Sequence, residues 1–343
     1  MDSVVDQGAP RGVGQHPSRP GATVLDRSSV EHGLSMVTSS IDVDGRALRF
    51  SVSNNVDAHG PEGEGTPPIW AINLHGYFAG GEMYARESLK IAHAMHWRVV
   101  NPSLPGFGGS DPLDWGAISL RTLSDQVEHI RVHLGLGPVV LIGHSMGAAV
   151  AVDYATAHPR STLGVIYRDG ISTPSWKHRP GLLPHALAAV APDVAPFADM
   201  AAAVALDLPD LLAGRLLHTL RWVLPDVRRN FKTLAHSVPV GSMLMTIDQR
   251  DQVLKLRDRH LPLLAEWGCF DRLTDADTAE EFGKCAEVEI QWVPGGHSWM
   301  LARPGGQADI LQRVRTGRTF VAQVEARAKR LRAASARREA AER

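Results

Sequence analysis

The stretch that most constrains the fold of this chain is residues 138–150, where an apolar β-branched run leads into a Gly-x-Ser-x-Gly pattern. Val139 to Ile142 has the length of a buried strand, and the small residues from Gly147 onward favour a helix. A strand that becomes a helix within about two residues crowds its own backbone, so glycine is expected on both sides of the serine. The stretch therefore predicts a tight strand-to-helix turn with Ser145 at its tip.

This turn makes Ser145 a candidate nucleophile. Its hydroxyl would lie at the start of a helix, where backbone N–H groups and the helix dipole favour developing negative charge. A serine hydroxyl is a weak nucleophile at neutral pH, and it needs a base, usually a histidine that a carboxylate holds in the right tautomer. The rest of the chain must therefore supply a histidine and an acid.

Strands and helices alternate along much of the remaining chain. Strands are predicted at 69–74, 97–101, 139–142, 163–167, 260–268 and 287–293, and helices at 82–95, 118–135 and 147–157, after a hairpin of 35–43 and 46–52. This alternation predicts an α/β fold with a mostly parallel sheet flanked by helices. In such a sheet the functional site lies at the carboxyl ends of the strands, where the glycine-bearing loops after Leu74 and Asn101 and the turn at Ser145 would meet.

The chain of 343 residues suits one large α/β domain with an insertion better than two equal domains. We expect the core to comprise residues 34–170 and 258–316. Between them, residues 171–257 lose the strand rhythm, and prolines divide this Ala- and Leu-rich stretch into short helices, which predicts a helical cap. Residues 1–33 are rich in Gly, Pro and Ser and are expected to be a disordered arm, and residues 317–343 to be a basic helix or tail.

Two loops after the last strands supply the base and the acid. His297 lies in a glycine-flanked loop after the final predicted strand, and Asp271 lies in the loop after the strand before it. The chain order Ser145, Asp271, His297 matches one of the three common serine-hydrolase arrangements and not the other two. Asp169, at the end of an earlier strand, is the alternative acid.

With these motifs in place, the chain resembles the α/β-hydrolase superfamily, specifically its cap-bearing serine hydrolase and esterase branch, from about residue 35 to 315. The resemblance is carried by His75-Gly76, the loop 105–111, the elbow Gly143 to Gly147, Trp267-Gly268-x-x-Asp271 and Gly296-His297. It implies the α/β-hydrolase fold with an inserted helical cap.

The resemblance also implies roles for single residues. Ser145 would attack a carbonyl, His297 would act as base and then as acid, and Asp271 would orient and stabilise the imidazolium. The backbone N–H groups of Tyr77 and Met146 would form the oxyanion hole. The residues expected to support these turns are His75, Gly76, Gly143, His144 and Gly147.

We therefore expect a serine hydrolase that cleaves a small to medium lipophilic carboxylic ester through an acyl-enzyme, since the predicted cap is strongly apolar. A carbon–carbon bond hydrolase acting on a vinylogous diketone is an alternative, because such relatives keep the serine and often a Ser-Met-Gly elbow. They usually have tryptophan directly after the catalytic histidine, whereas here Ser298 intervenes. A non-catalytic small-molecule-binding member and an acyltransferase also remain open. Epoxide opening and halide displacement are disfavoured because they require aspartate in place of Ser145.

The composition restricts the classes of partner and cofactor that we expect. A net charge of -1 and a hydrophobic fraction of 44% fit a globular protein with no nucleic-acid partner. No spaced His, Cys and Asp cluster indicates a metal, and no organic cofactor is expected. Two cysteines, Cys269 and Cys285, and the lack of an apolar signal segment lead us to expect a cytoplasmic protein.

The C-terminal stretch after residue 316 predicts an amphipathic helix. Phe320, Val324 and Ala328 fall on one face, and several Lys and Arg residues lie elsewhere. We interpret it as a docked last helix with a solvated tail, and contact with an anionic membrane surface is the alternative. The oligomeric state does not follow from the sequence.

Overall fold

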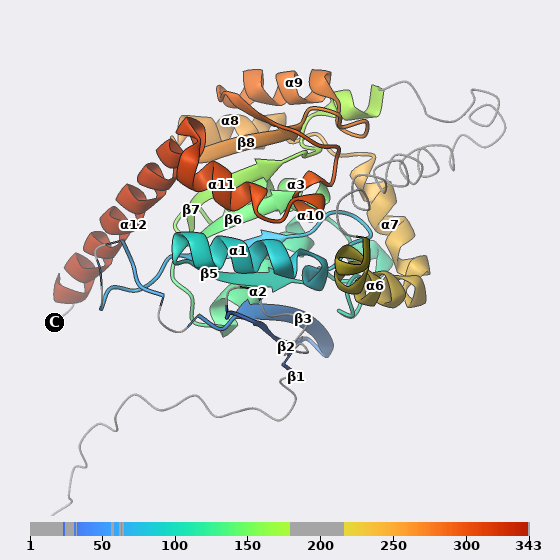
Figure 1. The fold of residues 1–343 in the computed structure, drawn as a ribbon, viewed down its shortest axis with the longest axis horizontal. Coiled ribbons are helices and arrows are strands. Elements are labelled where there is room, and N and C mark those ends of the chain that lie inside the picture. The colour runs from blue at the N-terminus through green and yellow to red at the C-terminus, as the bar shows by residue number, and fades with distance from the viewer. Residues whose placement is uncertain are drawn as a thin grey trace, which may run out of the picture.

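The computed structural model describes residues 23–24, 31, 33–55, 58–61, 63, 65–178 and 216–341. In these residues nine strands form a single sheet in the order β1-β2-β3-β5-β4-β6-β7-β8-β9 (Figure 1). The strands are β1 (Thr23–Val24), β2 (Met36–Val43), β3 (Arg46–Ser53), β4 (Trp70–Leu74), β5 (Arg98–Pro102), β6 (Val139–His144), β7 (Thr162–Arg168), β8 (Leu263–Gly268) and β9 (Ile290–Val293).

The sheet is mostly parallel, as the sequence predicts. Strands β4 to β9 pair in parallel, whereas β1, β2 and β3 add an antiparallel edge. The hairpin between β2 and β3 turns at Asp44 and Gly45, whose φ angles of 52° and 77° are those of a turn with left-handed central residues. Every residue of β6 is buried, because helices cover both faces of a parallel sheet.

Helices separate most of the parallel strands along the chain. They are α1 (Ala85–Met95), α2 (Leu120–His133), α3 (Met146–Ala157), α6 (Leu216–Lys232), α7 (Leu234–Leu244), α8 (Arg250–Asp258), α9 (Ala276–Ala286), α10 (Trp299–Ala302), α11 (Gly306–Arg313) and α12 (Arg315–Ala341), with the 3₁₀ turns η2 (Gly81–Tyr84), η3 (Trp115–Ala117) and η4 (Pro174–His178). Helix α2 begins with a capping box between Ser119 and Thr122.

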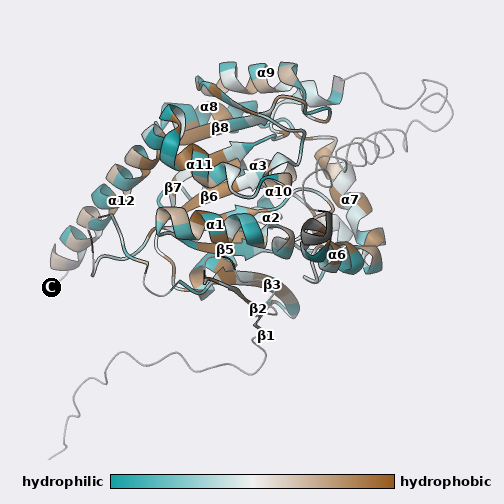
Figure 2. Ribbon diagram, in the orientation of Figure 1, coloured by the Kyte–Doolittle hydropathy of each residue, from teal (hydrophilic) through white to brown (hydrophobic). Residues whose placement is uncertain are grey.

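Two apolar layers hold the sheet between the helices. Successive residues of β6 alternate between them, because strand side chains point to opposite faces in turn. Val139 and Leu141 join the layer that includes α2, α3 and α8, and Val140 and Ile142 join the layer that includes α1, α11 and α12. Hydrophobic residues are accordingly frequent on the strands, whereas the helices combine hydrophobic and hydrophilic residues (Figure 2).

The N-terminal arm is not entirely without structure, which corrects the expectation for residues 1–33. β1 pairs with β2, whose outer edge presents backbone N–H and C=O groups to any strand that can align with it. Glu31 forms ion pairs with Arg86 at 3.0 Å and Lys90 at 2.7 Å. Glu31 also forms an isolated antiparallel β-bridge with Leu34.

Helix α8, assigned to the cap by the sequence, packs on the core. Its Val253 and Leu256 are fully buried in the layer that includes α3. The amphipathic pattern of α8 is the same whether it covers a sheet or another helix, so the sequence did not reveal its partner. Residues 179–215 of the predicted cap lie outside the described residues, whereas α6 and α7 are described.

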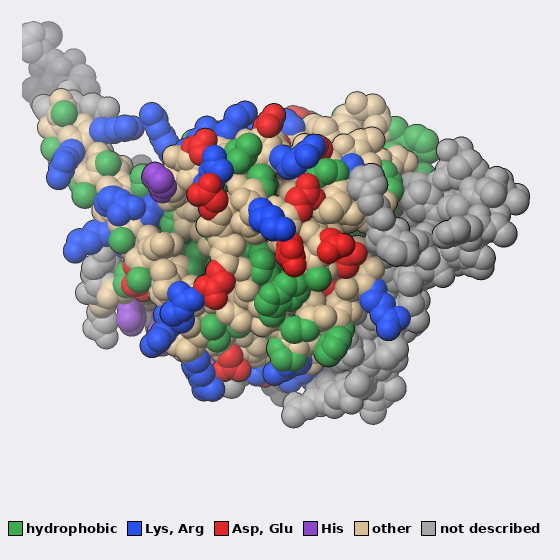
Figure 3. Space-filling view, turned by 90° about the horizontal axis from the view of Figure 1, so that it is seen from above, with side chains coloured by type: hydrophobic (Ala, Val, Ile, Leu, Met, Phe, Trp, Pro, Cys, Tyr) green, Lys and Arg blue, Asp and Glu red, His purple; other side chains and the backbone are tan. Residues whose placement is uncertain are grey.

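The long helix α12 packs on the sheet and then projects beyond it (Figure 1). Phe320 and Val324 are buried, and a Cβ atom at Gly164 of β7 would lie only 2.9 Å and 3.0 Å from their side chains. Lys and Arg side chains gather on the projecting end (Figure 3). Among the described helices, none combines the length and apolar character needed to cross a bilayer.

Candidate active site

The candidate site lies where the strand order reverses. β4 sits between β5 and β6, so the chain leaves β4 toward one side of the sheet and later returns to the other. Leu74 at the end of β4 is in register with Gly143 near the end of β6. Ligand sites of open α/β sheets lie at the carboxyl ends of strands at such a switch point. The loop after β4 and the turn at Ser145 therefore lie side by side there.

The turn at Ser145 is as crowded as the sequence suggests. Ser145 has a φ of 52°, a left-handed conformation that is rare for residues other than glycine. A Cβ atom at Gly143 would lie 2.5 Å from the Gly147 carbonyl oxygen, and one at Gly147 would lie 2.3 Å from the Leu74 carbonyl oxygen. Both flanking positions thus admit only glycine. The strained turn holds the buried Ser145 side chain at the edge of the sheet.

Two backbone N–H groups are available beside this serine. Met146 is the first residue of α3, so its N–H has no acceptor within the helix. Neither this N–H nor that of Tyr77 has an acceptor among the described residues. Gly76, next to Tyr77, lies so close that a Cβ atom there would be 3.4 Å from the Ser145 Cβ. The two N–H groups thus belong to segments that meet at the serine.

An acid–base pair comes from the loops after β8 and β9. His297 Nδ1 lies 2.8 Å from Asp271 Oδ2, and both side chains are buried. Asp271 also accepts hydrogen bonds from the backbone N–H groups of Leu273 at 2.7 Å and Thr274 at 3.0 Å, and from the Thr274 hydroxyl at 2.6 Å. Burial opposes ionisation of Asp271, but the charge of His297 and these hydrogen bonds outweigh it and lower its pKa.

The alternative acid Asp169 lies beside this pair. It follows β7 with a φ of 44°, and it accepts hydrogen bonds from the Gly268 N–H at 2.7 Å and from Trp299 Nε1 at 2.8 Å. Burial, and then the charge of Asp271, raise its pKa well above the usual value. Asp271, and not Asp169, is therefore the ionised carboxylate bonded to Nδ1 of the imidazole.

Asp169, Asp271 and His297 each place one possible metal-ligating atom within 4.8 Å of the other two. Both carboxyl groups, however, already accept hydrogen bonds from protein donors. Burial and the charge of Asp271 also disfavour ionisation of Asp169, whose pKa is raised. These contacts favour a hydrogen-bonded acid–base group over a metal centre.

His144 of the elbow connects the serine turn to His297. Its ring centroid lies 4.8 Å from that of His297, and its Nε2 lies 2.8 Å from the His297 carbonyl oxygen, which can only accept a hydrogen bond. Nδ1 lies 2.6 Å from the Tyr84 hydroxyl, which itself accepts from the Gly76 N–H at 3.3 Å. Burial holds the pKa of His144 well below its usual value, so the neutral ring donates from Nε2 and accepts at Nδ1.

His75 has a corresponding role beneath the loop after β4. Nε2 accepts from the Leu104 N–H at 2.8 Å, and Nδ1 lies 2.8 Å from the Gly76 carbonyl oxygen. Burial lowers the pKa of His75 to about 4, so the ring is neutral at physiological pH. It ties the loop after β4 to the loop after β5.

The sequence analysis did not predict several hydrogen-bond partners of the site residues. Thr274 lies three residues after Asp271, a spacing typical of local Asp turns, and could have been foreseen. The sequence places Trp299 two residues after His297, but it does not predict the hydrogen bond from Trp299 to Asp169. Tyr84 lies 60 residues from its partner His144 in the sequence, and no local pattern indicates this contact.

Comparison with known proteins identifies the family. The Alpha/beta hydrolase family matches residues 74–310. The AB hydrolase superfamily protein YisY of Bacillus subtilis is 27% identical over 224 residues, which cover 64% of this chain and 79% of that protein.

A shorter match and a solved structure agree with this relationship. The Pseudomonas putida 2-hydroxy-6-oxononadienedioate/2-hydroxy-6-oxononatrienedioate hydrolase 2 is 36% identical over 107 residues, 29% of this chain and 34% of that protein. A thermophilic esterase from Thermogutta terrifontis superposes with a TM-score of 0.56 at 18% identity, covering 85% of this chain and 99% of the esterase. The family match spans more than half of the chain, so this protein belongs to the alpha/beta hydrolase family.

Proposed function

We propose that this protein is a serine hydrolase that cleaves carboxylic esters through an acyl-enzyme. The observation that carries the proposal is the buried Asp271–His297 pair, joined at 2.8 Å, whose imidazole packs beside the elbow that presents Ser145. An ionised carboxylate on Nδ1 fixes the tautomer and stabilises the imidazolium that forms when the ring takes a proton.

In the acylation step Ser145 Oγ attacks the ester carbonyl. Since Nδ1 of His297 is engaged with Asp271, Nε2 is the nitrogen that accepts the serine proton. The carbonyl oxygen becomes an oxyanion, and the N–H groups of Tyr77 and Met146 donate to it. The imidazolium then gives its proton to the departing alcohol, which leaves the acyl group on Ser145.

Deacylation repeats these steps with water as the nucleophile. His297 removes a proton from water, the same two N–H groups stabilise the second oxyanion, and the proton returns to Ser145 as the acid departs. An alcohol in place of water would make the reaction an acyl transfer without changing any of these roles.

A small to medium lipophilic ester is the substrate class that we propose. The Tyr77 ring packs against Phe78 and, edge to face, against Phe107, so apolar surface surrounds the loop that holds the candidate oxyanion donor. In α6 and α7, Phe231 and Val238 are exposed apolar side chains. Surroundings of this kind favour an acyl chain or an aromatic ester over a charged substrate.

A fluorophosphonate probe and a panel of p-nitrophenyl esters of graded chain length test the proposal. We expect rapid labelling of the wild type, no labelling of Ser145→Ala, and faster hydrolysis of medium than of short polar acyl esters. An unlabelled wild type without turnover would instead indicate a non-catalytic, ligand-binding member of the family. Preference for short polar acyl groups would refute the substrate class but not the mechanism.

Carbon–carbon bond hydrolysis is the second candidate. It is supported by the 36% identity over 107 residues with the Pseudomonas putida hydrolase and by the Ser145-Met146-Gly147 elbow. Ser298, between His297 and Trp299, departs from the pattern expected for that class. Including a vinylogous diketone in the substrate panel separates the two activities, and faster turnover of the diketone than of every ester would favour this candidate.

A further inference from the structure

The loop that carries Tyr77 is held from outside the core by α6 and α7. The Tyr77 hydroxyl donates to the Ser237 carbonyl oxygen at 2.9 Å. The next residue, Phe78, packs its ring edge to face against Phe231, with a centroid distance of 5.7 Å. Asn230 Nδ2 then donates to the carbonyl oxygens of Phe78 at 2.8 Å and Ala79 at 3.0 Å.

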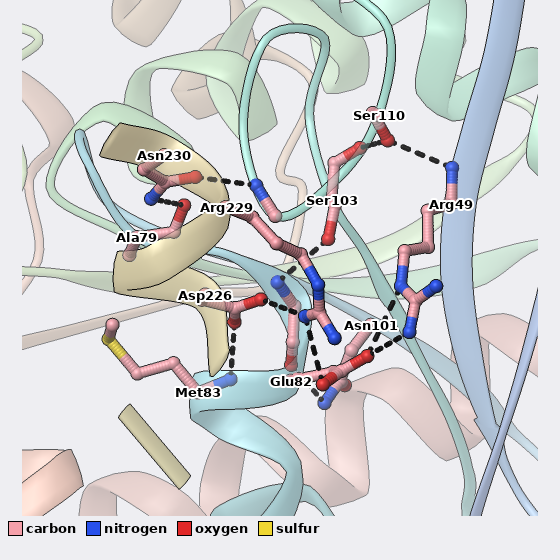
Figure 4. Close-up of polar contacts among 12 residues, drawn as sticks. Arg49, Ala79, Glu82, Met83, Asn101, Ser103, Ser110, Asp226, Arg229 and Asn230 are labelled. Carbon is pink, nitrogen blue, oxygen red and sulfur yellow. Dashed lines mark hydrogen bonds and ion pairs between the residues drawn. The ribbon is translucent and has the colours of Figure 1, made fainter. Parts of the chain in front are cut away.

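Asn230 also joins this loop to a second one. Its Oδ1 accepts from the Gly108 N–H at 2.7 Å (Figure 4). The orientation of the amide is unambiguous, because both carbonyls need a donor and the N–H needs an acceptor. Asn230 is 1% exposed, so the protein groups, and not bulk solvent, surround its amide. Asn230 thus joins the loops after β4 and β5 at a second point, in addition to His75.

The loop that Asn230 holds has a strained backbone. Phe78 has a φ of 58°, in the left-handed region that non-glycine residues rarely occupy unless their surroundings impose it. Asn230 bonds the carbonyl of Phe78 itself and that of the next residue, Ala79. The Tyr77 N–H lies one residue before it, so its direction depends on whether this conformation is maintained.

Helix α6 is itself fixed to the core, so Asn230 is presented from a rigid element. Asp226 accepts from the Met83 N–H at 2.8 Å. Arg229 forms ion pairs with Asp226 at 2.9 Å and with Glu82 at 3.0 Å, and Glu82 is also paired with Arg49 of β3 (Figure 4). A Cβ atom at Gly80 would lie 2.5 Å from the Asp226 carboxyl carbon, which shows how closely the helix approaches the loop.

We propose that Asn230 is a positioning residue for the oxyanion hole. By holding the Phe78 and Ala79 carbonyls, it keeps the Tyr77 N–H aimed at the oxygen that becomes negative during acylation and deacylation. This inference rests on the proposed serine hydrolase function. Through Asn230, helix α6 takes part in transition-state stabilisation.

The test compares Asn230→Leu, which removes all three bonds, with Asn230→Asp, which keeps only the acceptor for the Gly108 N–H. For Asn230→Leu we expect kcat for a p-nitrophenyl ester to fall by about 10- to 100-fold, with KM changed by less than about threefold, because an oxyanion donor acts mainly in the transition state. The ratio of Asn230→Leu to wild-type kcat should not vary with pH.

Asn230→Asp supplies a readout that a purely structural role would not change. Its carboxylate repels the Phe78 and Ala79 carbonyls, whereas protonation restores one donor to them. The ratio of Asn230→Asp to wild-type kcat should therefore rise as the pH falls. Because both proteins share the titration of His297, the ratio cancels it. The ratio tests the positioning role of Asn230 even if Asn230→Leu does not fold.

Thr233→Val is the matched control. Thr233 lies one turn further along the chain and donates to the Gly106 carbonyl oxygen at 2.9 Å, so the variant removes a bond between this segment and the core without touching residues 77–79. We expect its kcat to stay within about twofold of wild type. Wild-type kcat in folded Asn230→Leu, or a pH-independent ratio for Asn230→Asp, would overturn the inference alone. A wild type with neither turnover nor fluorophosphonate labelling would overturn the proposed function and the inference together.

Discussion

Asp169 and Asp271 lie side by side at the carboxyl ends of β7 and β8, with carboxyl oxygens within 4.8 Å of each other, yet they favour opposite protonation states. The pKa of Asp271 is lowered, whereas that of Asp169 is raised well above its usual value. Two carboxylates this close cannot both ionise easily. His297 Nδ1 bonds to Asp271, so the negative charge is favoured on Asp271 and disfavoured on Asp169.

This difference predicts unequal effects of replacing the two acids. Asp271→Asn should lower kcat by about 10³- to 10⁴-fold, because an amide neither stabilises the imidazolium nor holds the required tautomer. Asp169→Asn should keep kcat within about tenfold of wild type, since Asp169 does not bond to the imidazole and the amide oxygen still accepts one of its two hydrogen bonds. Hydrolysis of a p-nitrophenyl ester measures both. Loss of turnover in Asp169→Asn with activity retained in Asp271→Asn would reverse the assignment.

A second prediction concerns His144, whose Nε2 donates to the His297 carbonyl oxygen at 2.8 Å. His144→Phe keeps a ring of similar size but loses this bond, which lets the His297 loop shift. Because small displacements of a catalytic base are costly, we expect kcat and the rate of fluorophosphonate labelling to fall together by about 10- to 100-fold.

Tyr84→Phe provides the comparison for His144→Phe. It removes the hydroxyl at 2.6 Å from Nδ1 but leaves the His144–His297 bond in place, so a smaller loss is expected. If His144→Phe lowered the melting temperature and left kcat unchanged, His144 would serve the fold and not the position of the base.

The sequence predicts the parts of this molecule that local patterns specify. The elbow between β6 and α3 follows from an apolar run, two glycines and a serine that are neighbours in the chain. The predicted strand 260–268 begins only at Leu263, because His260 has a φ of 49° and Pro262 lacks the N–H that a ladder requires. The last strand likewise begins at Ile290, after Glu287, which ends α9 in a left-handed conformation.

Local patterns do not predict contacts between residues that are far apart in the sequence. Asn230 lies 152 residues from Phe78 in the sequence, and nothing near it distinguishes its amide from one on a solvated helix face. Similarly, the sequence offers Asp169 and Asp271 as alternatives, and only their placement on adjacent strands shows that they form one group. The electrostatic division between them depends on burial, which chain order does not specify.

The packing of α12 yields a third prediction. Removal of residues 334–343, from the projecting end, should change the free energy of unfolding by less than about 0.5 kcal/mol. Truncation at residue 318 would also remove Phe320 and Val324, which are buried against β7, and should cost several kcal/mol. Urea denaturation measures both variants.

Vesicle co-sedimentation tests the same helix for membrane contact. We expect removal of residues 334–343 to leave co-sedimentation with anionic vesicles at physiological salt unchanged. Binding that the full chain shows and the shortened chain lacks would instead support a membrane role for the basic end.

The last prediction concerns Asp226, the buried α6 carboxyl that accepts from the Met83 N–H. Burial, and then the charge of Glu82, outweigh the ion pair with Arg229 and raise its pKa from 3.8 to about 6. The folded state therefore holds this proton more tightly than the unfolded state, so the contribution to stability is complete below about pH 4 and is lost as the pH rises through 6.

Asp226→Asn keeps an acceptor for Met83 but does not titrate. The unfolding free energy of wild type minus that of Asp226→Asn should thus fall by about 2 to 3 kcal/mol between pH 4 and pH 7. Asp248→Asn is the control, because its hydrogen bond with Arg250 lowers the pKa of Asp248, which places its titration below this range and leaves the corresponding difference flat. A flat difference for Asp226→Asn as well would show that Asp226 is ionised throughout and that α6 is held to the core by charge pairing with Arg229.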